Sequence, residues 1–409
     1  MNLADALCTE VCAKSLPELS LSPFFDRKWP SIYEALEDGS IDTDALVQVN
    51  MKFAPDNRID GYYPIGLDTS NIYRTYTDIS KDRTNLHAPD GSIRPGWQYS
   101  SVVVLPESAS SWTYSLHNKR VDVQSKPSLT AKDQLESIIK YLPDDSLVIG
   151  DRYYGSAEFI SFIKDMPCNC LIRIQKHRVF YKPAPPKTSK RGRPRKHGDI
   201  FKCSDQSTQG EPDQVSVYTD ETGKECKVSI WSGFHYKLCP DASLYIIKVE
   251  RHNAKGTKRD PIVSWFIWKG ELPKIESIPP VYKIRFSHEH AFKFDKRNLL
   301  WDKPMLKTPE QNDIWTQIVS IAHNMIVIAR EFGESISRPW NNSARPATPE
   351  QVRRVMSKII GDSGTPALSC QPRGKSPGWP KGKKRTPAER YRVHKKGNKS
   401  SETAPSKAA

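Results

Sequence analysis

Two short apolar runs that each lead into an aspartate constrain the fold of this chain most strongly. Residues 63–68 read YPIGLD, and residues 146–151 read SLVIGD. Short apolar runs of this kind are typical of buried strands. In an α/β sheet, ligand sites form where the strands end. The sequence therefore predicts two strands that end at Asp68 and Asp151. For each aspartate taken alone, the alternative is a side chain that only satisfies a turn.

The segments around these two runs indicate the fold class. Short strand-like runs occur at residues 101–105, 112–116 and 169–175, and apolar spacing predicts helices at 129–142 and 157–165. Several strands followed by alternating strands and helices are typical of a mixed α/β sheet. Two short helices are also predicted near the N-terminus, at 29–36 and 44–49. We interpret them as a brace against the core, because no convincing helix-turn-helix pattern is present.

The second half of the chain changes character twice. Short strands at 214–218, 226–232 and 244–249 are separated by turn signals and predict an all-β stretch. Residues 281–333 then return to a helical pattern, and one more helix is predicted at about 349–360 within a polar, basic tail. No internal repeat is evident.

One of these helices has a clear beginning and end in the sequence. Residues 308–311 read TPEQ, with Thr308 as N-cap, proline in the first turn and glutamine three residues later. Gly333 is predicted to end the helix. Between them apolar residues recur at helical spacing, which indicates core packing: Trp315, Ile318, Ala322, Met325 and Ala329.

The positive charge of the chain is concentrated in two arms. The net charge is +15, and residues 182–198 contain seven Lys or Arg and no acid. Residues 371–400 contain eleven Lys or Arg and one acid, Glu389. These arms carry +7 and +10, so the rest of the chain is close to neutral at −2. A near-neutral body with two basic arms indicates a polyanionic partner, with nucleic acid first and a merely solubilising role as the alternative.

The cysteines and the apolar segments indicate a reducing compartment. The eight cysteines are scattered and include no CxxC pair, so a structural zinc site has little support. Asp5 and Glu10 interrupt the apolar start, which argues against a signal peptide. No apolar run approaches the roughly 18 residues needed to span a membrane. We expect a cytoplasmic protein with free thiols and no membrane partner.

A four-residue pattern near residue 289 carries the strongest functional signal. At roughly 100° per residue, its members fall within about 60° of one another on a helix. Apolar Ile284, Ala291 and Leu299 fall on another side and would pack on the sheet. The alternative is a solvated helix with Arg-to-Glu pairing four residues apart. The pattern consists of Tyr282, Arg285, Glu289 and Lys296.

This pattern, Tyr-x2-Arg-x3-Glu-x6-Lys, resembles the signature of bacterial insertion-sequence transposases of the DDE type, which have an RNase H-like core. Residues 66–70 (GLDTS) and 148–152 (VIGDR) resemble the strands that carry the first and second aspartate of that family. The helix opened by Thr308 and the tail at 373–385 resemble a bacterial branch of it. The resemblance covers residues 56 to about 396.

The resemblance implies a site and a reaction. Asp68, Asp151 and Glu289 would be the catalytic residues and would bind two Mg²⁺ ions, with Mn²⁺ as a substitute. Such ions, about 4 Å apart, activate the attacking oxygen and stabilise the leaving one. Tyr282, Arg285, Lys296 and Arg152 would bind DNA near the cut. The partner would be double-stranded DNA at transposon ends and target, held by a homodimer and associated with the bacterial nucleoid.

The long separation between Asp151 and Glu289 adds candidate DNA contacts. The two residues are 138 positions apart, whereas one crossover needs only about 30 residues, so a β-rich insertion is expected between them. Trp231, Trp265 and Trp268 in it are candidates for stacking on an extruded base, with ordinary core packing as the alternative. Residues 190–196 (KRGRPRK) resemble an AT-hook. Its candidate DNA-binding residues are Arg191, Arg193 and Arg195, and a flexible phosphate-binding loop is the alternative reading.

The predicted organisation has five segments. They are a helical segment at 1–55, an RNase H-like core at 56–175 and 276–335, a β-rich insertion at 176–275, and a basic, partly disordered tail at 336–409. The predicted function is metal-dependent cleavage at transposon ends followed by strand transfer, with or without a hairpin intermediate. The alternatives are an endonuclease without strand transfer and a domesticated, non-catalytic DNA-binding protein. A zinc-dependent regulator would need paired ligands that these cysteines do not provide.

Overall fold

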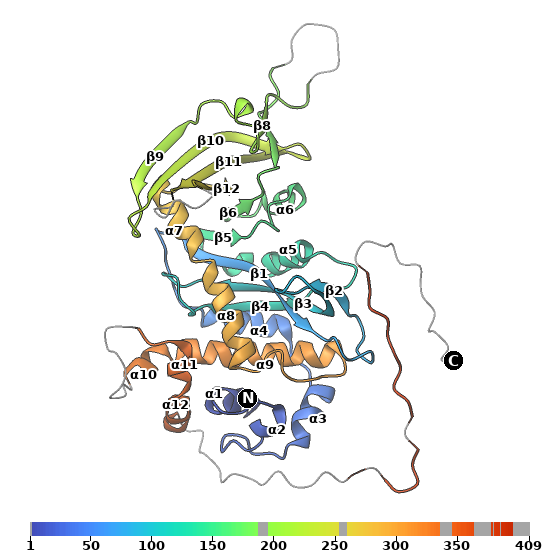
Figure 1. Cartoon of the computed structure of the whole chain (residues 1–409). Helices are drawn as coiled ribbons and strands as arrows, with labels where there is room; N and C mark the ends of the chain where they lie inside the picture. Colours follow the sequence, from blue (N-terminus) through green and yellow to red (C-terminus); the bar gives the residue numbers. More distant parts are fainter. Residues whose placement is uncertain are drawn as a thin grey trace.

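A single mixed sheet runs through the part of the chain that the structure describes. The computed structural model describes residues 2–186, 195–252, 260–335, 346–363, 378, 380–384 and 386–395. Within these residues, 12 strands join one sheet, and helices cover both of its faces (Figure 1). The predicted mixed α/β fold is confirmed.

Five strands form the centre of the sheet in the order β4-β3-β1-β5-β6. They are β1 (Tyr63–Tyr73), β3 (Ile93–Val104), β4 (Tyr114–Arg120), β5 (Ser146–Gly150) and β6 (Asn169–Ile174). Strands β4, β3 and β1 are antiparallel, whereas β1, β5 and β6 are parallel. Strand β2 (Thr84–His87) pairs with the first part of β3 at the edge. This is the RNase H-like arrangement that the sequence resemblance implied.

Alternation along the strands builds a core on each face of the sheet. On one face Leu67, Val102 and Val148 pack with the helices α4 (Thr43–Lys52), α5 (Pro127–Ile138) and α6 (Ala157–Ile163). On the other face Val103 and Ile149 pack under α7 (Ile278–Lys283). Because Leu67 points to the first face, the next residue along β1, Asp68, points to the face that α7 covers.

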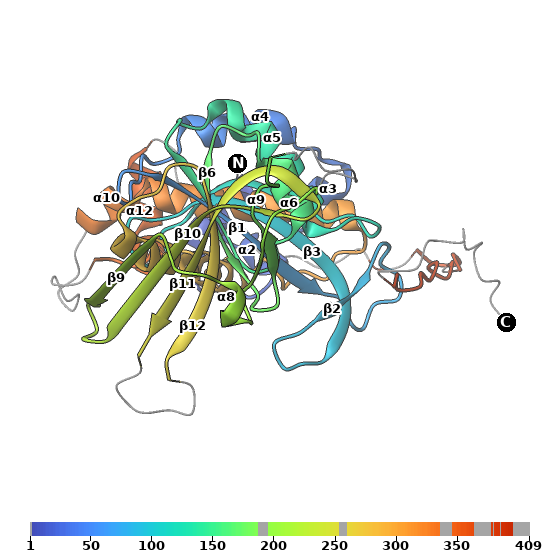
Figure 2. The ribbon, with the colours of Figure 1, turned by 90° about the horizontal axis from the view of Figure 1, so that it is seen from above.

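The strands after β6 continue the same sheet. β12 (Ile262–Lys269) pairs with β6, and β11 (Cys239–Arg251) and β10 (Glu225–Tyr236) follow outward. β7 (Val179–Tyr181) and β9 (Gln214–Thr219) each pair with β10, and β8 (Ile200–Lys202) pairs with β7. Seen from above, β9–β12 and β2–β3 splay apart (Figure 2), as the twist of a long sheet requires.

A helical layer lies against the opposite end of the molecule (Figure 1). It contains α1 (Asn2–Thr9), α2 (Leu16–Leu19), α3 (Pro30–Asp38), α9 (Pro309–Ile328) and α11 (Pro349–Arg353). Buried Leu7 of α1 shares one core with Trp315 of α9. Ile32 of α3 lies in the same core and Val47 of α4 packs in the core of the sheet, which confirms that the two helices predicted near the N-terminus pack against the core. Thr308 caps α9 through the predicted capping box.

Two helix boundaries differ from the sequence prediction. Gly333 does not end the long helix, because α9 stops at Ile328 and Gly333 lies inside α10 (Arg330–Ser335). A Cβ added to Gly333 would lie 2.6 Å from Val352 Cγ1, so this glycine permits close packing of α11. The single helix expected at 349–360 is two helices, α11 and α12 (Met356–Asp362).

The described residues contain no helix that is both long and apolar enough to cross a membrane. Seven of the eight cysteines fall within the described residues, and all seven are free thiols.

Candidate active site

The first two acids of the predicted site lie side by side on neighbouring strands. Leu67 of β1 is paired with Gly150 of β5 in a parallel register, so Asp68 and Asp151 are the next residue on each strand. β5 ends at Gly150, one residue before the predicted end at Asp151, but β1 continues to Tyr73. Asp68 therefore lies within its strand and not at its end, because β3 keeps pairing with the polar residues that follow. The sheet opens beside β1 where β5 stops.

Asp68 is held in a buried position. Its side chain is 16% exposed, and its Oδ1 accepts a hydrogen bond from the Thr69 amide at 2.8 Å. Burial raises the pKa of Asp68 to about 6, and the Arg285 guanidinium opposes this shift. The nearby carboxylates of Asp151 and Glu289 raise this pKa further. Asp151 is half-buried and accepts a hydrogen bond from the Tyr153 amide at 2.8 Å.

The third acid comes from a helix that is broken once. The predicted continuous helix is divided into α7 and α8 (Phe286–Arg297). Ile284 and Arg285 between them keep right-handed helical dihedral angles, and the amides of Arg285 and Ser287 bond three residues back, to Tyr282 and Ile284. This tight turn preserves the direction of the chain, so Glu289 lies one turn into α8.

Arg285 joins the first and third acids. Its Nη1 donates to Asp68 Oδ2 at 2.9 Å, and its Nη2 donates to Glu289 Oε1 at 2.7 Å. The arginine side chain is 8% exposed, whereas that of Glu289 is 44% exposed. The Arg-to-Glu pair that the sequence left open as an alternative is therefore present, between Arg285 and Glu289. The same arginine also binds Asp68, so it connects the helix to the sheet.

The donor set fits a divalent cation, although the side chains do not yet enclose one. Among the described residues, no three His, Cys, Asp or Glu side chains converge closely enough to hold a metal ion. Arg285 lies between Asp68 and Glu289 and bonds to both. Three carboxylates supply the hard oxygen ligands that Mg²⁺ prefers. One arginine pairs with two of the three acids, and the raised pKa of Asp68 indicates that more positive charge would stabilise the site.

Two other residues of the predicted motif contribute mainly to packing. Tyr282 is buried and packs edge-on against Phe266, with ring centroids 4.7 Å apart. Lys296 donates from Nζ to the Asn71 carbonyl at 2.8 Å, which fixes α8 to the second half of β1. The role of both side chains in binding DNA near the cut stays a prediction.

The tryptophans predicted to stack on a DNA base are buried. Trp265 is in the core on one face of β12, where it stacks on Trp231 at 6.0 Å. Trp268 is fully buried on the other face and donates from Nε1 to the Glu271 carbonyl at 2.9 Å. Because both faces of β12 are covered, the packing interpretation accounts for both residues in this structure, and the stacking role stays a prediction.

The predicted basic contacts are only partly described. Arg152 and Arg195 are exposed, and Arg152 directly follows Asp151. Arg191 and Arg193 lie outside the described residues, as do residues 373–377 of the basic tail.

The sequence reasoning missed an exposed stripe beside Glu289. Its members recur at spacings of three and four residues along α7 and α8, so they share one helical face. The spacing of these residues in the sequence is the signal that predicts this face, which lies next to the face that carries Glu289. We call this set the α8 stripe: Lys283, Phe286, His290, Lys293 and Arg297.

Comparison with protein families gives one match. The model of the DDE superfamily endonuclease family matches residues 3–234, more than half of the chain, including Asp68 and Asp151. Comparison with curated proteins gives no significant match. Enzymes of this kind depend on divalent metal ions and act on DNA. The acids described above agree with this, because Arg285 joins Asp68 to Glu289 and Asp151 follows the strand beside Asp68. The chain therefore belongs to the DDE superfamily endonuclease family.

Proposed function

We propose that this protein is a DNA transposase that cuts DNA at transposon ends and joins the freed 3′ ends to target DNA. Asp68, Asp151 and Glu289 are the catalytic carboxylates in this proposal. The observation that carries it is the approach of these three acids from β1, β5 and α8 in a member of an endonuclease family. The order of the acids along the chain and the Tyr-x2-Arg-x3-Glu-x6-Lys pattern favour a transposase.

The proposed cations are two Mg²⁺ ions, with Mn²⁺ as a substitute, held by the same three residues. When bound, they would supply an activated hydroxide and stabilise charge on the phosphate. The protein's own contribution is to position the three carboxylates. The strand pairing of β1 and β5 fixes Asp68 beside Asp151, and α8 brings Glu289 over the opening in the sheet.

The proposed DNA-binding surface includes the α8 stripe and Arg152. Lys293 and Arg297 are exposed on the face of α8 next to Glu289, and Arg152 is exposed beside Asp151. Contacts from such side chains to backbone phosphates position a duplex without reading its sequence. We extend the proposal to a homodimer, in which two copies hold the two ends of one transposon.

Cleavage of a labelled transposon-end duplex in Mg²⁺, with a circular target plasmid present, tests this function. Native protein and Glu289→Gln are compared, with Glu331→Gln on α10 as a matched control because Glu331 is an exposed glutamate away from the site. We expect the native protein and the control to give cut and joined products. Glu289→Gln should give neither product but still bind the duplex.

Each other outcome has a distinct meaning. Equal cleavage by native protein and Glu289→Gln would remove Glu289 from the proposed site. Cleavage without joined products would favour an endonuclease that lacks strand transfer. Binding without cleavage by every protein, on duplexes from both ends, would favour a non-catalytic DNA-binding role.

A further inference from the structure

Arg285 makes an unusual set of contacts for an arginine in an ion pair. A single guanidinium connects an acid on β1 to an acid on α8, and these acids are 217 and 4 residues away along the chain. Both oxygens of Asp68 are engaged, Oδ1 by the Thr69 amide and Oδ2 by Arg285. The Thr69 amide is fixed in the β1 backbone. The arginine side chain is therefore the partner of Asp68 that can move.

We infer that Arg285 occupies the cation position in the metal-free protein and competes with divalent metal ions for Asp68 and Glu289. The inference rests on the proposed function, because it assumes that these two acids are metal ligands. A guanidinium and a divalent cation placed within a few ångströms of each other repel strongly in a buried site. A metal ion that binds both carboxylates must therefore displace the guanidinium.

Two observations indicate that the guanidinium can adopt a second position. Its Nε is buried and has no hydrogen-bond partner among the described residues, so the bridge leaves one donor unsatisfied. The guanidinium carbon also lies 5.0 Å from the ring centre of Phe286, an exposed member of the α8 stripe. A rotation of the side chain towards Phe286 would bring it to the proposed DNA surface.

At that surface the guanidinium can bind a backbone phosphate through two parallel N–H groups. DNA would then withdraw Arg285 from the carboxylates and free them for metal. By thermodynamic linkage, DNA must raise the affinity for metal by the same factor by which metal raises the affinity for DNA. Arg285 thus couples the two binding events and offsets part of the negative charge of the carboxylates when no metal ion is bound.

Mn²⁺ binding to the full chain without DNA, measured by calorimetry or electron paramagnetic resonance, tests the competition. The variants are Arg285→Met, Asp68→Asn and the control Arg94→Met, whose arginine pairs with Asp90 on the surface. We expect Arg285→Met to bind Mn²⁺ roughly tenfold more tightly than native protein, Asp68→Asn to bind it more weakly, and Arg94→Met to match native protein. Arg285→Lys, which keeps one charge but cannot bridge two acids, should give a smaller gain, and it serves if Arg285→Met does not fold.

The results separate this inference from the proposed function. Suppose that the Arg285 variants bind Mn²⁺ no more tightly than native protein while Asp68→Asn weakens binding. The inference that Arg285 competes with metal is then wrong, and the assignment of Asp68 as a metal ligand is kept. If Asp68→Asn leaves Mn²⁺ binding unchanged, the proposed metal site is wrong.

A second measurement tests the coupling to DNA. Mn²⁺ affinity is measured with and without a 3′-blocked duplex of arbitrary sequence, which supplies phosphates but no transposon end. We expect the duplex to raise Mn²⁺ affinity in native protein by a larger factor than in Arg285→Met. An equal increase in both proteins would show that Arg285 does not transfer from the carboxylates to DNA.

Discussion

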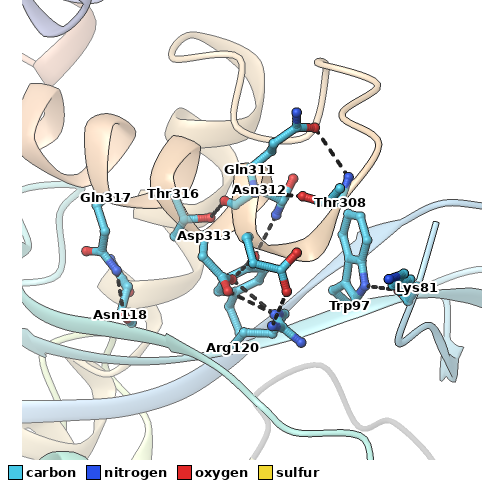
Figure 3. Close-up of polar contacts among 12 residues, drawn as sticks. Lys81, Trp97, Asn118, Arg120, Thr308, Gln311, Asn312, Asp313, Thr316 and Gln317 are labelled. Atoms are coloured by element: carbon cyan, nitrogen blue, oxygen red, sulfur yellow. Dashed lines mark hydrogen bonds and ion pairs between the residues drawn. The ribbon is translucent and has the colours of Figure 1, made fainter. Parts of the chain in front are cut away.

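Two arginine–carboxylate networks in this protein have similar parts and different charge balance. In the first, at the start of α9, Arg120 donates from Nε to both oxygens of Asp313 at 3.1 Å (Figure 3). Asp313 also accepts a hydrogen bond from Tyr99 at 2.6 Å, and Asn312 donates to the same tyrosine oxygen at 2.7 Å. One arginine thus faces one well-bonded acid, while Glu310 is 4.0 Å away and largely exposed.

The second network sets one arginine, Arg285, against three acids: Asp68, Asp151 and Glu289. Two of them are bonded to it, and Asp151 adds to the negative charge that raises the pKa of Asp68. Both networks connect β-strands to a helix, so position in the fold does not separate them. Charge balance does, because a network that only stabilises the fold has no need of unmatched acids. The excess negative charge of the second network is what a cation site requires.

The largest effect that would sharpen this contrast is on catalysis. Asp68→Asn removes one charge from the proposed cation site but keeps the shape of the side chain. We expect DNA cleavage to fall by at least about 10²–10³-fold, the scale of losing one group that stabilises transition-state charge. Arg120→Met should leave cleavage unchanged at temperatures where it is folded. A comparable loss in both variants would break the distinction between the networks.

Stability without metal should move in the opposite direction to activity. Asp68 has a folded pKa of about 6 against an ordinary value of 3.8, so its ionised form is disfavoured by folding. Its contribution therefore lowers stability as pH rises from about 4 through 6, and the cost persists at pH 7. We expect Asp68→Asn to be more stable than native protein at pH 7 by about 1–3 kcal/mol in urea unfolding with chelator present.

The difference between the two proteins should disappear only below about pH 3, where Asp68 is protonated in both the folded and unfolded states. Comparing native protein with the variant removes the contributions of other titrating groups. A variant that is less stable than native protein at pH 7 would mean that Arg285 compensates the charge of Asp68 fully.

Metal binding should restore the stability that is lost when Arg285 is replaced, but not the stability that is lost when Arg120 is replaced. Arg120→Met leaves Asp313 without its cation and, because this acid is partly exposed, should cost about 1–2 kcal/mol. Arg285→Met should also lower stability in chelator, since three acids then face one another. Adding Mn²⁺ should restore the melting temperature of Arg285→Met but not that of Arg120→Met. Rescue of both variants would point to metal binding outside the proposed site.

Much of the framework was readable from local sequence patterns. Apolar runs located β1 and β5, and the TPEQ sequence located the capped start of α9, because strand alternation and capping depend on neighbouring residues. The spacing of the four-residue motif placed Arg285 and Glu289 on one face, and their contact is local as well.

What the sequence did not indicate depends on distant partners. β1 continues past Asp68 through polar residues because β3 pairs with them, and no local pattern reports that partner. Trp265 and Trp268 are buried because both faces of β12 are covered by segments from elsewhere in the chain. The bond from Arg285 to Asp68 joins residues 217 positions apart, so the bridge was visible only in the fold.

The smallest expected effect concerns the α8 stripe. A change there should alter DNA binding without altering either arginine–carboxylate network. Lys293 is exposed, and its position on the proposed DNA surface predicts one phosphate contact. Removing one such contact reduces the slope of log affinity against log salt by about 0.9. We therefore expect Lys293→Gln to weaken duplex binding only a few-fold at moderate salt, with that change in slope and with unchanged Mn²⁺ affinity and stability. Lys358→Gln, an exposed lysine on α12, is the matched control. If both variants lose the same small amount of affinity, the effect is one of overall charge and the stripe does not face the DNA.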